Sequence, residues 1–179
     1  MANSVYISLL EEGVNAWNQW RDENKEARPD LRGINLFKKQ LQGVNFRDVD
    51  LTGAGLEKAE LANAVFSMAD LTDVRMAGAN LSRSILSSAT LAGADLSGCN
   101  LYSANLRGAD FRKAKLIGTN FSGADLSKAN FSGADMTDAR LWMKYFGKTP
   151  VAILNGTVLQ GAVLNKVDTS MVDFSKAVR

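Results

Sequence analysis

The sequence contains no histidine, one cysteine and two prolines among 179 residues. The lack of histidine excludes histidine-based general bases, nucleophile relays and histidine-ligated zinc sites. A single cysteine forms neither an internal disulfide nor a CxxC pair, which fits a reducing compartment. There is no run of about 18 apolar residues to span a membrane, and the N-terminus has neither the basic start nor the apolar core of a signal peptide. We therefore expect a soluble, cytoplasmic protein.

The charge is nearly balanced, with 21 basic and 19 acidic side chains and a formal net charge of +2. This balance favours neither nucleic acid nor acidic partners. The sequence offers no nucleophile–base pair and no cluster of metal-ligating residues. We therefore predict a protein that is not an enzyme, holds no metal or cofactor and does not bind membranes.

A strict five-residue repeat dominates the chain. From Leu31 to Leu141, every fifth residue is Leu, Phe or Met, which makes 23 consecutive matches. Neither the helical period of 3.6 residues nor the strand period of 2 produces a repeat of five. We call this residue the centre of its pentad. A small residue, usually Ala, stands two positions before the centre, Asp or Asn usually stands one position before it, and Gly often follows two positions after it.

Alternation along an extended segment explains this pattern. The centre and the small residue, two positions apart, point to the same side and face inward, while the Asp or Asn between them faces outward. A type II turn then closes each unit, with its second central residue at positive φ. Four such sides make a square coil of 20 residues, so residues 20 apart stack. The predicted aromatic core pairs are Phe46 with Phe66 and Phe111 with Phe131.

The repeat resembles that of the pentapeptide-repeat family, whose motif is A(D/N)LXX, and the resemblance covers residues 29–143. It implies a right-handed quadrilateral β-helix, an all-β solenoid of about seven coils; the hand comes from the resemblance alone. The segment that begins at Pro29 looks like that of cyanobacterial members. The motif is matched at Ala69-Asp70-Leu71, Ala79-Asn80-Leu81, Ala94-Asp95-Leu96, Ala104-Asn105-Leu106 and Ala124-Asp125-Leu126.

The pattern divides the chain into four segments. Residues 1–28 are predicted to form an N-terminal helical cap, 29–143 the 23 pentads, 144–151 a loop that interrupts the register, and 152–179 the final repeats and the C-terminal end. A cap is needed because the first coil of a solenoid exposes apolar core and unpaired strand edges.

One amphipathic helix is predicted within residues 4–27, with Ser4 as its N-cap and Arg28-Pro29 as its end. An amphipathic helix that binds a partner is the alternative interpretation. The predicted apolar face comprises Val5, Leu9, Leu10, Val14 and Trp17.

Two outward patches are candidate partner surfaces. The first is an apolar pair 20 residues apart, with a methionine at a neighbouring corner and an arginine at each end. Such a patch is typical of protein interfaces, and ordinary surface apolarity is the competing interpretation. The second patch is aromatic and lies on a different face. The first comprises Arg47, Val65, Met68, Ile85 and Arg107, and the second comprises Tyr102 and Trp142, next to Met143.

The leading functional hypothesis is a non-catalytic scaffold or regulatory adaptor for an unknown protein partner. The resemblance supports it, since one relative in filamentous cyanobacteria acts in heterocyst regulation through protein contact. The alternative, which the resemblance also implies, is a DNA mimic that inhibits the type II topoisomerase gyrase. Mimicry needs a strongly negative rod, whereas residues 29–143 carry 13 basic and 12 acidic groups. Direct nucleic-acid binding is disfavoured because no basic stripe with interleaved aromatics is present.

The C-terminal end has no comparable helix over it. The resemblance implies that a homodimer can form end to end there, with Val172, Phe174 and Val178 at the contact. The alternative is that residues 167–179 fold over as their own cap.

Overall fold

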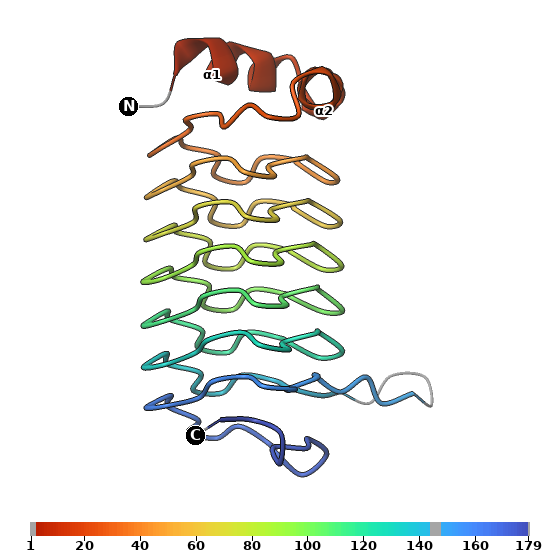
Figure 1. The fold of residues 1–179 in the computed structure, drawn as a ribbon, viewed down its shortest axis with the longest axis vertical. Helices are drawn as coiled ribbons and strands as arrows, with labels where there is room; N and C mark the ends of the chain where they lie inside the picture. The colour runs from red at the N-terminus through yellow and green to blue at the C-terminus, as the bar shows by residue number, and fades with distance from the viewer. Residues whose placement is uncertain (1–2, 144–147, 179) are drawn as a thin grey trace.

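A computed structural model describes residues 3–143 and 148–178 (Figure 1). Two short helices, α1 (Ser4–Glu11) and α2 (Val14–Glu23), lie across one end of a rod of stacked coils. The chain descends coil by coil from the helices to the far end, where the last described residues lie. Neither helix of the described segments is long and apolar enough to cross a membrane.

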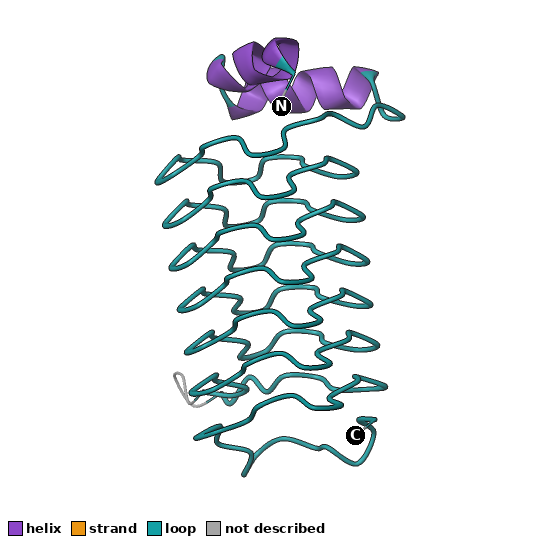
Figure 2. Cartoon of the chain, turned by 90° about the vertical axis from the view of Figure 1, so that its left-hand side faces the viewer, coloured by secondary structure: helices purple, strands orange, loops and turns teal. Residues whose placement is uncertain are grey.

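Each coil has four sides, which we call walls 1 to 4 after the centres of the first coil, Leu31, Leu36, Leu41 and Phe46. Parallel bridges join residues 20 apart on every wall, as in the pair Val65 and Ile85. Each bridge is isolated, because a corner interrupts the chain before a second pair forms, and Figure 2 accordingly shows no strand in the described coils. The expected β-solenoid is thus built from single bridges instead of strands, and helices are added at one end.

Backbone pairing follows one rule in the inner coils, which have a coil on either side. Around Leu51, the centre N–H donates to Asp70 O at 2.8 Å, and the N–H of Gly53 donates to Thr72 O at 2.9 Å. The N–H of Ala54 closes the corner onto Leu51 O at 2.9 Å, and the fourth amide points back to the coil above. Four of the five amides are therefore used by the coil itself, and the residue after the centre keeps a free N–H.

The interior of the tube is filled. The Phe46 and Phe66 rings are 5.5 Å apart, and the Phe111 and Phe131 rings stack at 4.8 Å with an angle of 1° between their planes. The second residue after each centre from Leu31 to Met136 has a positive φ, for example +67° at Gly98. Together with the bond that closes the corner, this is the geometry of a type II turn.

The N-terminal segment forms two helices, so the prediction of a single helix over residues 4–27 is wrong. Gly13 has a φ of 109° and separates α1 from α2. The side chain of Asn3, and not that of Ser4, caps α1 by accepting the Val5 N–H at 3.0 Å. Val5, which the sequence placed on the apolar face, is 68% exposed. Helix α2 ends at Glu23, before the proline, because the backbone and side chain of Asn24 both donate to Trp20 O.

Helix α2 replaces a coil on wall 4. The indole N–H of Trp17 donates to Asn45 O at 2.7 Å, Asn18 Oδ1 accepts the Asn45 N–H at 2.8 Å, and Arg21 donates to Arg47 O at 2.7 Å. These three backbone groups are the ones that a preceding coil pairs elsewhere in the rod. Trp17, Leu10 and the half-buried Val14 close the apolar end of the core.

The register shifts once, between wall 3 and wall 4. Bridged residues are 20 positions apart in the sequence from the first coil to the pair Asn120 and Arg140. The next pair, Asp125 and Ile153, is 28 positions apart. At this shift Trp142 and Val151 form an antiparallel bridge. The predicted loop over 144–151 includes residues 144–147, which lie outside the described residues.

We expect Trp17→Ala to lower the free energy of unfolding by about 3–5 kcal/mol, because it leaves a cavity beside Phe46 and unpairs Asn45 O. Urea unfolding followed by circular dichroism measures the change. Gln19→Ala, at an exposed position of α2, is the control and should stay close to the parent protein. An unchanged midpoint for Trp17→Ala contradicts the role of α2 as a coil substitute.

Candidate functional site

The outward Asp and Asn side chains have a structural role. Their Oδ1 atoms accept the N–H that each pentad leaves free, as Asp135 does from Thr137 at 3.0 Å and Asn130 does from Ser132 at 2.9 Å. Hydroxyl groups of the same two partners add bonds of 2.6 Å. An outward position that lacks Asp or Asn therefore gives up a local hydrogen bond, which makes these exceptions informative.

Hydrogen bonds to the ionised form lower the pKa of these carboxyl groups. The Arg32 guanidinium, followed by the Arg32 backbone N–H, lowers the pKa of Asp30 to about 2. Hydrogen bonds from the side chain and backbone of Thr137 lower the pKa of Asp135. The arginine–aspartate pairs of wall 1 are solvent-exposed and contribute little stability by themselves.

The first candidate patch lies on wall 4. Val65 and Ile85 are bridged neighbours in adjacent coils, and Ile85 is 38% exposed. The hydroxyls of Ser67 and Ser87 are 3.2 Å apart beside them. The two arginines bound the patch along the rod, in the coil above and the coil below, and both are exposed. Arg47 also pairs with Asp48 at 3.1 Å. We call Val65, Ile85, Arg47 and Arg107 the wall-4 patch.

Met68 does not belong to the wall-4 patch. It lies at the corner between walls 4 and 1, is 54% exposed, and lines a groove of about 310 Å³ together with Asp48, Asp50 and Asp70. The sequence had joined Met68 to the patch, but the corner turns its side chain toward acidic neighbours.

The second candidate patch is divided in the structure. Tyr102 and Met143 line a groove of about 280 Å³ on wall 3 together with Arg83. Trp142 lines a separate groove with Arg140, Lys166 and Asp168. Trp142 pairs with Val151 in an antiparallel bridge, and among the described residues it shares no groove with Tyr102.

Residues 3–143 and 148–178 contain no group of three or more His, Cys, Asp or Glu side chains that could hold a metal ion. The thiol of Cys99 is buried and donates to Met76 O at 2.9 Å. Burial raises the pKa of the Cys99 thiol to about 12, so the reactive thiolate is not populated at neutral pH.

Two features were missed by the sequence reasoning. On wall 3, Asn120 donates to Asn100, Asn100 to Asn80, and Asn80 to Glu60, in a chain of amide bonds along the rod. The recurrence of asparagine every 20 residues could have predicted this chain. The second feature is a cavity of about 420 Å³ between the helices and the first coil; its only signal was Lys39, a charged residue at an inward position.

Comparisons with known proteins agree on the type of fold. A family model described as pentapeptide repeats matches the chain with eight copies, over residues 30–67, 40–76, 69–102 and 104–142. No curated protein matches the chain significantly.

Several solved structures are similar. HetL from the cyanobacterium Nostoc sp. strain PCC 7120, involved in heterocyst differentiation regulation, is 24% identical, covers 89% of this chain and 92% of its own, and has a TM-score of 0.33. A pentapeptide repeat protein from Cyanothece 51142 is 24% identical, with coverages of 90% and 96% and a TM-score of 0.45. A plasmid-mediated fluoroquinolone resistance protein is 18% identical, with coverages of 84% and 89% and a TM-score of 0.38. At these identities the likeness concerns the fold.

We predict that Asp135→Asn makes stability less sensitive to acid and that Asn130→Asp makes it more sensitive. The lowered pKa of Asp135 means that its carboxylate stabilises the fold above the pKa of the unfolded chain, and that this contribution is lost as the pH falls below about 4 toward the folded value. Asparagine accepts the same bonds at every pH.

Urea midpoints at neutral and acid pH measure both variants. Each should match the parent at neutral pH, and the two should diverge in opposite directions in acid. Parallel acid profiles for the two variants contradict the assignment.

Proposed function

The chain belongs to the pentapeptide-repeat family, and we propose that it works as a non-catalytic scaffold that binds a protein partner through the wall-4 patch. The fold of this family is a right-handed quadrilateral β-helix, and its members are generally non-catalytic. Such a tube has its usable chemistry on the outside, because leucine, phenylalanine and alanine fill the inside. Binding through a flat outer wall is the usual mode of solenoid proteins.

The composition of the wall-4 patch supports its role. Val65 and Ile85 stand where Asp or Asn would accept the free N–H of Ser67 and Ser87, and among the described residues no other group accepts these amides. The two side chains are also outside the core. They therefore supply neither the local hydrogen bond nor core packing, whereas an apolar centre between two arginines is typical of protein interfaces.

A regulatory adaptor is the form of this function that we favour. HetL, one of the similar structures, is a protein involved in heterocyst differentiation regulation. For the present chain that likeness is an argument about type of function only, because the fold alone is shared.

A DNA mimic that inhibits gyrase is the second candidate, since one similar structure is a fluoroquinolone resistance protein. The charge distribution argues against it. Residues 29–143 have a net charge of +1 from 13 basic and 12 acidic groups, and residues 144–179 have a net charge of +3 from five basic and two acidic groups. A rod without excess negative charge does not reproduce the phosphate field of duplex DNA.

The open C-terminal end supports a homodimer as part of the proposal. A cavity of about 460 Å³ there is lined by Leu159, Leu164 and Phe174. Val178 is 54% exposed, although its backbone pairs with Val158. Apolar side chains around an unfilled coil end favour a second copy as the cover.

The double variant Val65→Asp, Ile85→Asp should lose the partner in affinity purification from the native host with mass spectrometry. Its fold should persist, because each aspartate supplies the oxygen that Ser67 or Ser87 lacks. Thr90→Asp, at the equivalent position of wall 1, is the matched control and should keep the partner. Equal recovery by the parent and the double variant would rule out the wall-4 patch.

The dimer is tested by sedimentation equilibrium. We expect the parent protein to sediment as a dimer at micromolar concentration and Val178→Asp to sediment as a monomer with an unchanged circular dichroism spectrum. A parent protein that stays monomeric at higher concentration argues against end-to-end pairing.

A further inference from the structure

The helices seal only part of the first coil. On wall 4, α2 pairs the upward-facing backbone groups of Asn45 and Arg47, and on wall 1 the N–H of Asn3 donates to Asp30 O at 2.9 Å. On walls 2 and 3 the equivalent groups belong to Asn35 and Gln40. Within residues 3–143 and 148–178, the backbone N–H and C=O of these two residues make no hydrogen bond.

The second coil shows how such an edge pairs with a chain that lies above it. In the second coil, Gly55 stands below Asn35; its N–H donates to Ile34 O at 2.9 Å, and its C=O accepts the Leu36 N–H at 2.7 Å. Glu60, below Gln40, pairs with Lys39 O and the Leu41 N–H in the same way. The unpaired groups of Asn35 and Gln40 therefore have the spacing and direction to pair with an extended chain lying above them.

Beside this edge lies the cavity of about 420 Å³. Ile7, Leu10 and Val14 of the helices face Leu36 and Leu41 of the coil across it. Its volume is within the range of ligand-binding pockets and is large enough for apolar side chains of a peptide. The open edge and the apolar cavity are thus adjacent parts of one surface.

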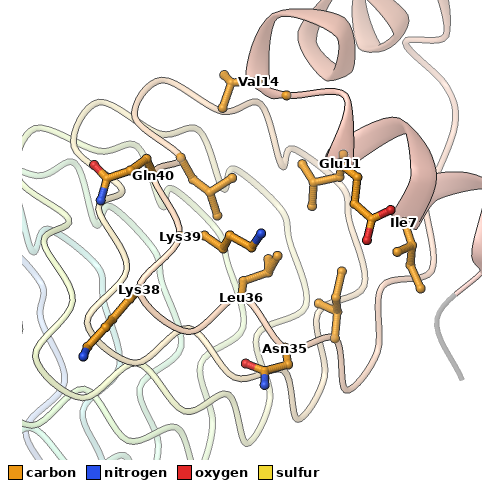
Figure 3. Close-up of a pocket in the computed structure, with 12 residues that line it drawn as sticks. Ile7, Glu11, Val14, Asn35, Leu36, Lys38, Lys39 and Gln40 are labelled. Atoms are coloured by element: carbon orange, nitrogen blue, oxygen red, sulfur yellow. The ribbon is translucent and has the colours of Figure 1, made fainter.

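Lys39 gives the cavity its charge. It occupies the inward position of wall 3, which holds alanine, cysteine or threonine in the five coils below it. Figure 3 shows its side chain lying along the cavity between Gln40 and Leu36, whereas the side chain of Lys38 points away. Glu11 lines the opposite side, but no ion pair joins it to Lys39 among the described residues.

We propose that walls 2 and 3 of the first coil bind an extended peptide of a partner protein, which adds one more layer to the rod with apolar side chains in the cavity and a carboxylate beside Lys39. The backbone of the peptide pairs with Asn35 and Gln40, and its acidic side chain takes the position directly above Lys39. A peptide fits better than a small apolar anion, because only a peptide satisfies the open backbone edge as well as the charge and the cavity. This site is separate from the wall-4 patch.

The probe is a fluorescein-labelled peptide that copies residues 54–63, the stretch of the second coil beneath this edge, with Ala59→Asp so that a carboxylate lies above Lys39. Fluorescence anisotropy should show saturable binding to the full-length protein. Lys39→Glu should weaken binding about tenfold and should bind instead a peptide with Ala59→Lys. Lys58→Glu is the matched control, since Lys58 is exposed at the same corner one coil below and does not line the cavity. This variant should bind like the parent.

A second peptide separates backbone pairing from simple anion binding. Methylation of the nitrogen at the position copied from Leu56 removes the N–H that donates to Asn35 O, so this peptide should bind much more weakly. Dodecanoate, an apolar anion without a peptide backbone, should compete only weakly. Circular dichroism melting confirms that the variants are folded. The proposal is overturned by no saturable binding, by equal binding of the methylated peptide, or by equal effects of Lys58→Glu and Lys39→Glu.

Discussion

Parallel pairing between residues 20 apart is the constraint on which the rest of the molecule depends. In the inner coils it uses four amides of a typical pentad, and it holds the walls of successive coils in register. The interior is consequently narrow, so the two inward positions accept only a centre such as Leu51 and a small partner such as Ala54. The same pairing leaves the N–H of the residue after the centre without a backbone acceptor. The Asp or Asn before the centre accepts this N–H, and this hydrogen bond explains why those residue types recur there.

The corners show that this pairing outweighs local preference. Positive φ favours glycine, yet Lys58, Asp73 and Ser88 adopt it, at a cost of about 1–2 kcal/mol for each residue with a side chain. The hydrogen bonds of the coils on either side hold these corners in place. Side-chain identity at a corner is therefore free to serve the outer surface, as Met68 illustrates.

At the ends of a solenoid the repeating interactions stop, which leaves backbone groups and apolar side chains uncovered. The two ends of this rod differ in how these groups are covered. At the helical end, Trp17, Asn18 and Arg21 use side-chain atoms to replace a missing backbone. This replacement covers wall 4 but not walls 2 and 3, which leaves an edge and a cavity together. At the other end, Phe174 and its neighbours line an opening that neither α1 nor α2 covers. Because the interior is filled, the surfaces that could bind a partner lie at the two ends and on the outer walls.

The sequence alone predicted the coil, because a period of five with two inward positions fits short sides that close after four units, and the structure confirms the resulting step of 20. It also indicated that Val65 and Ile85 are neighbours, since a fixed step places any two residues. The tertiary structure decided what the period does not govern. The break at Gly13, the separation of Trp142 from Tyr102 and the cavity beside Lys39 all arise where non-repeating segments meet the repeat. Their positions depend on contacts between residues distant in the chain, and such contacts have no period from which they can be predicted.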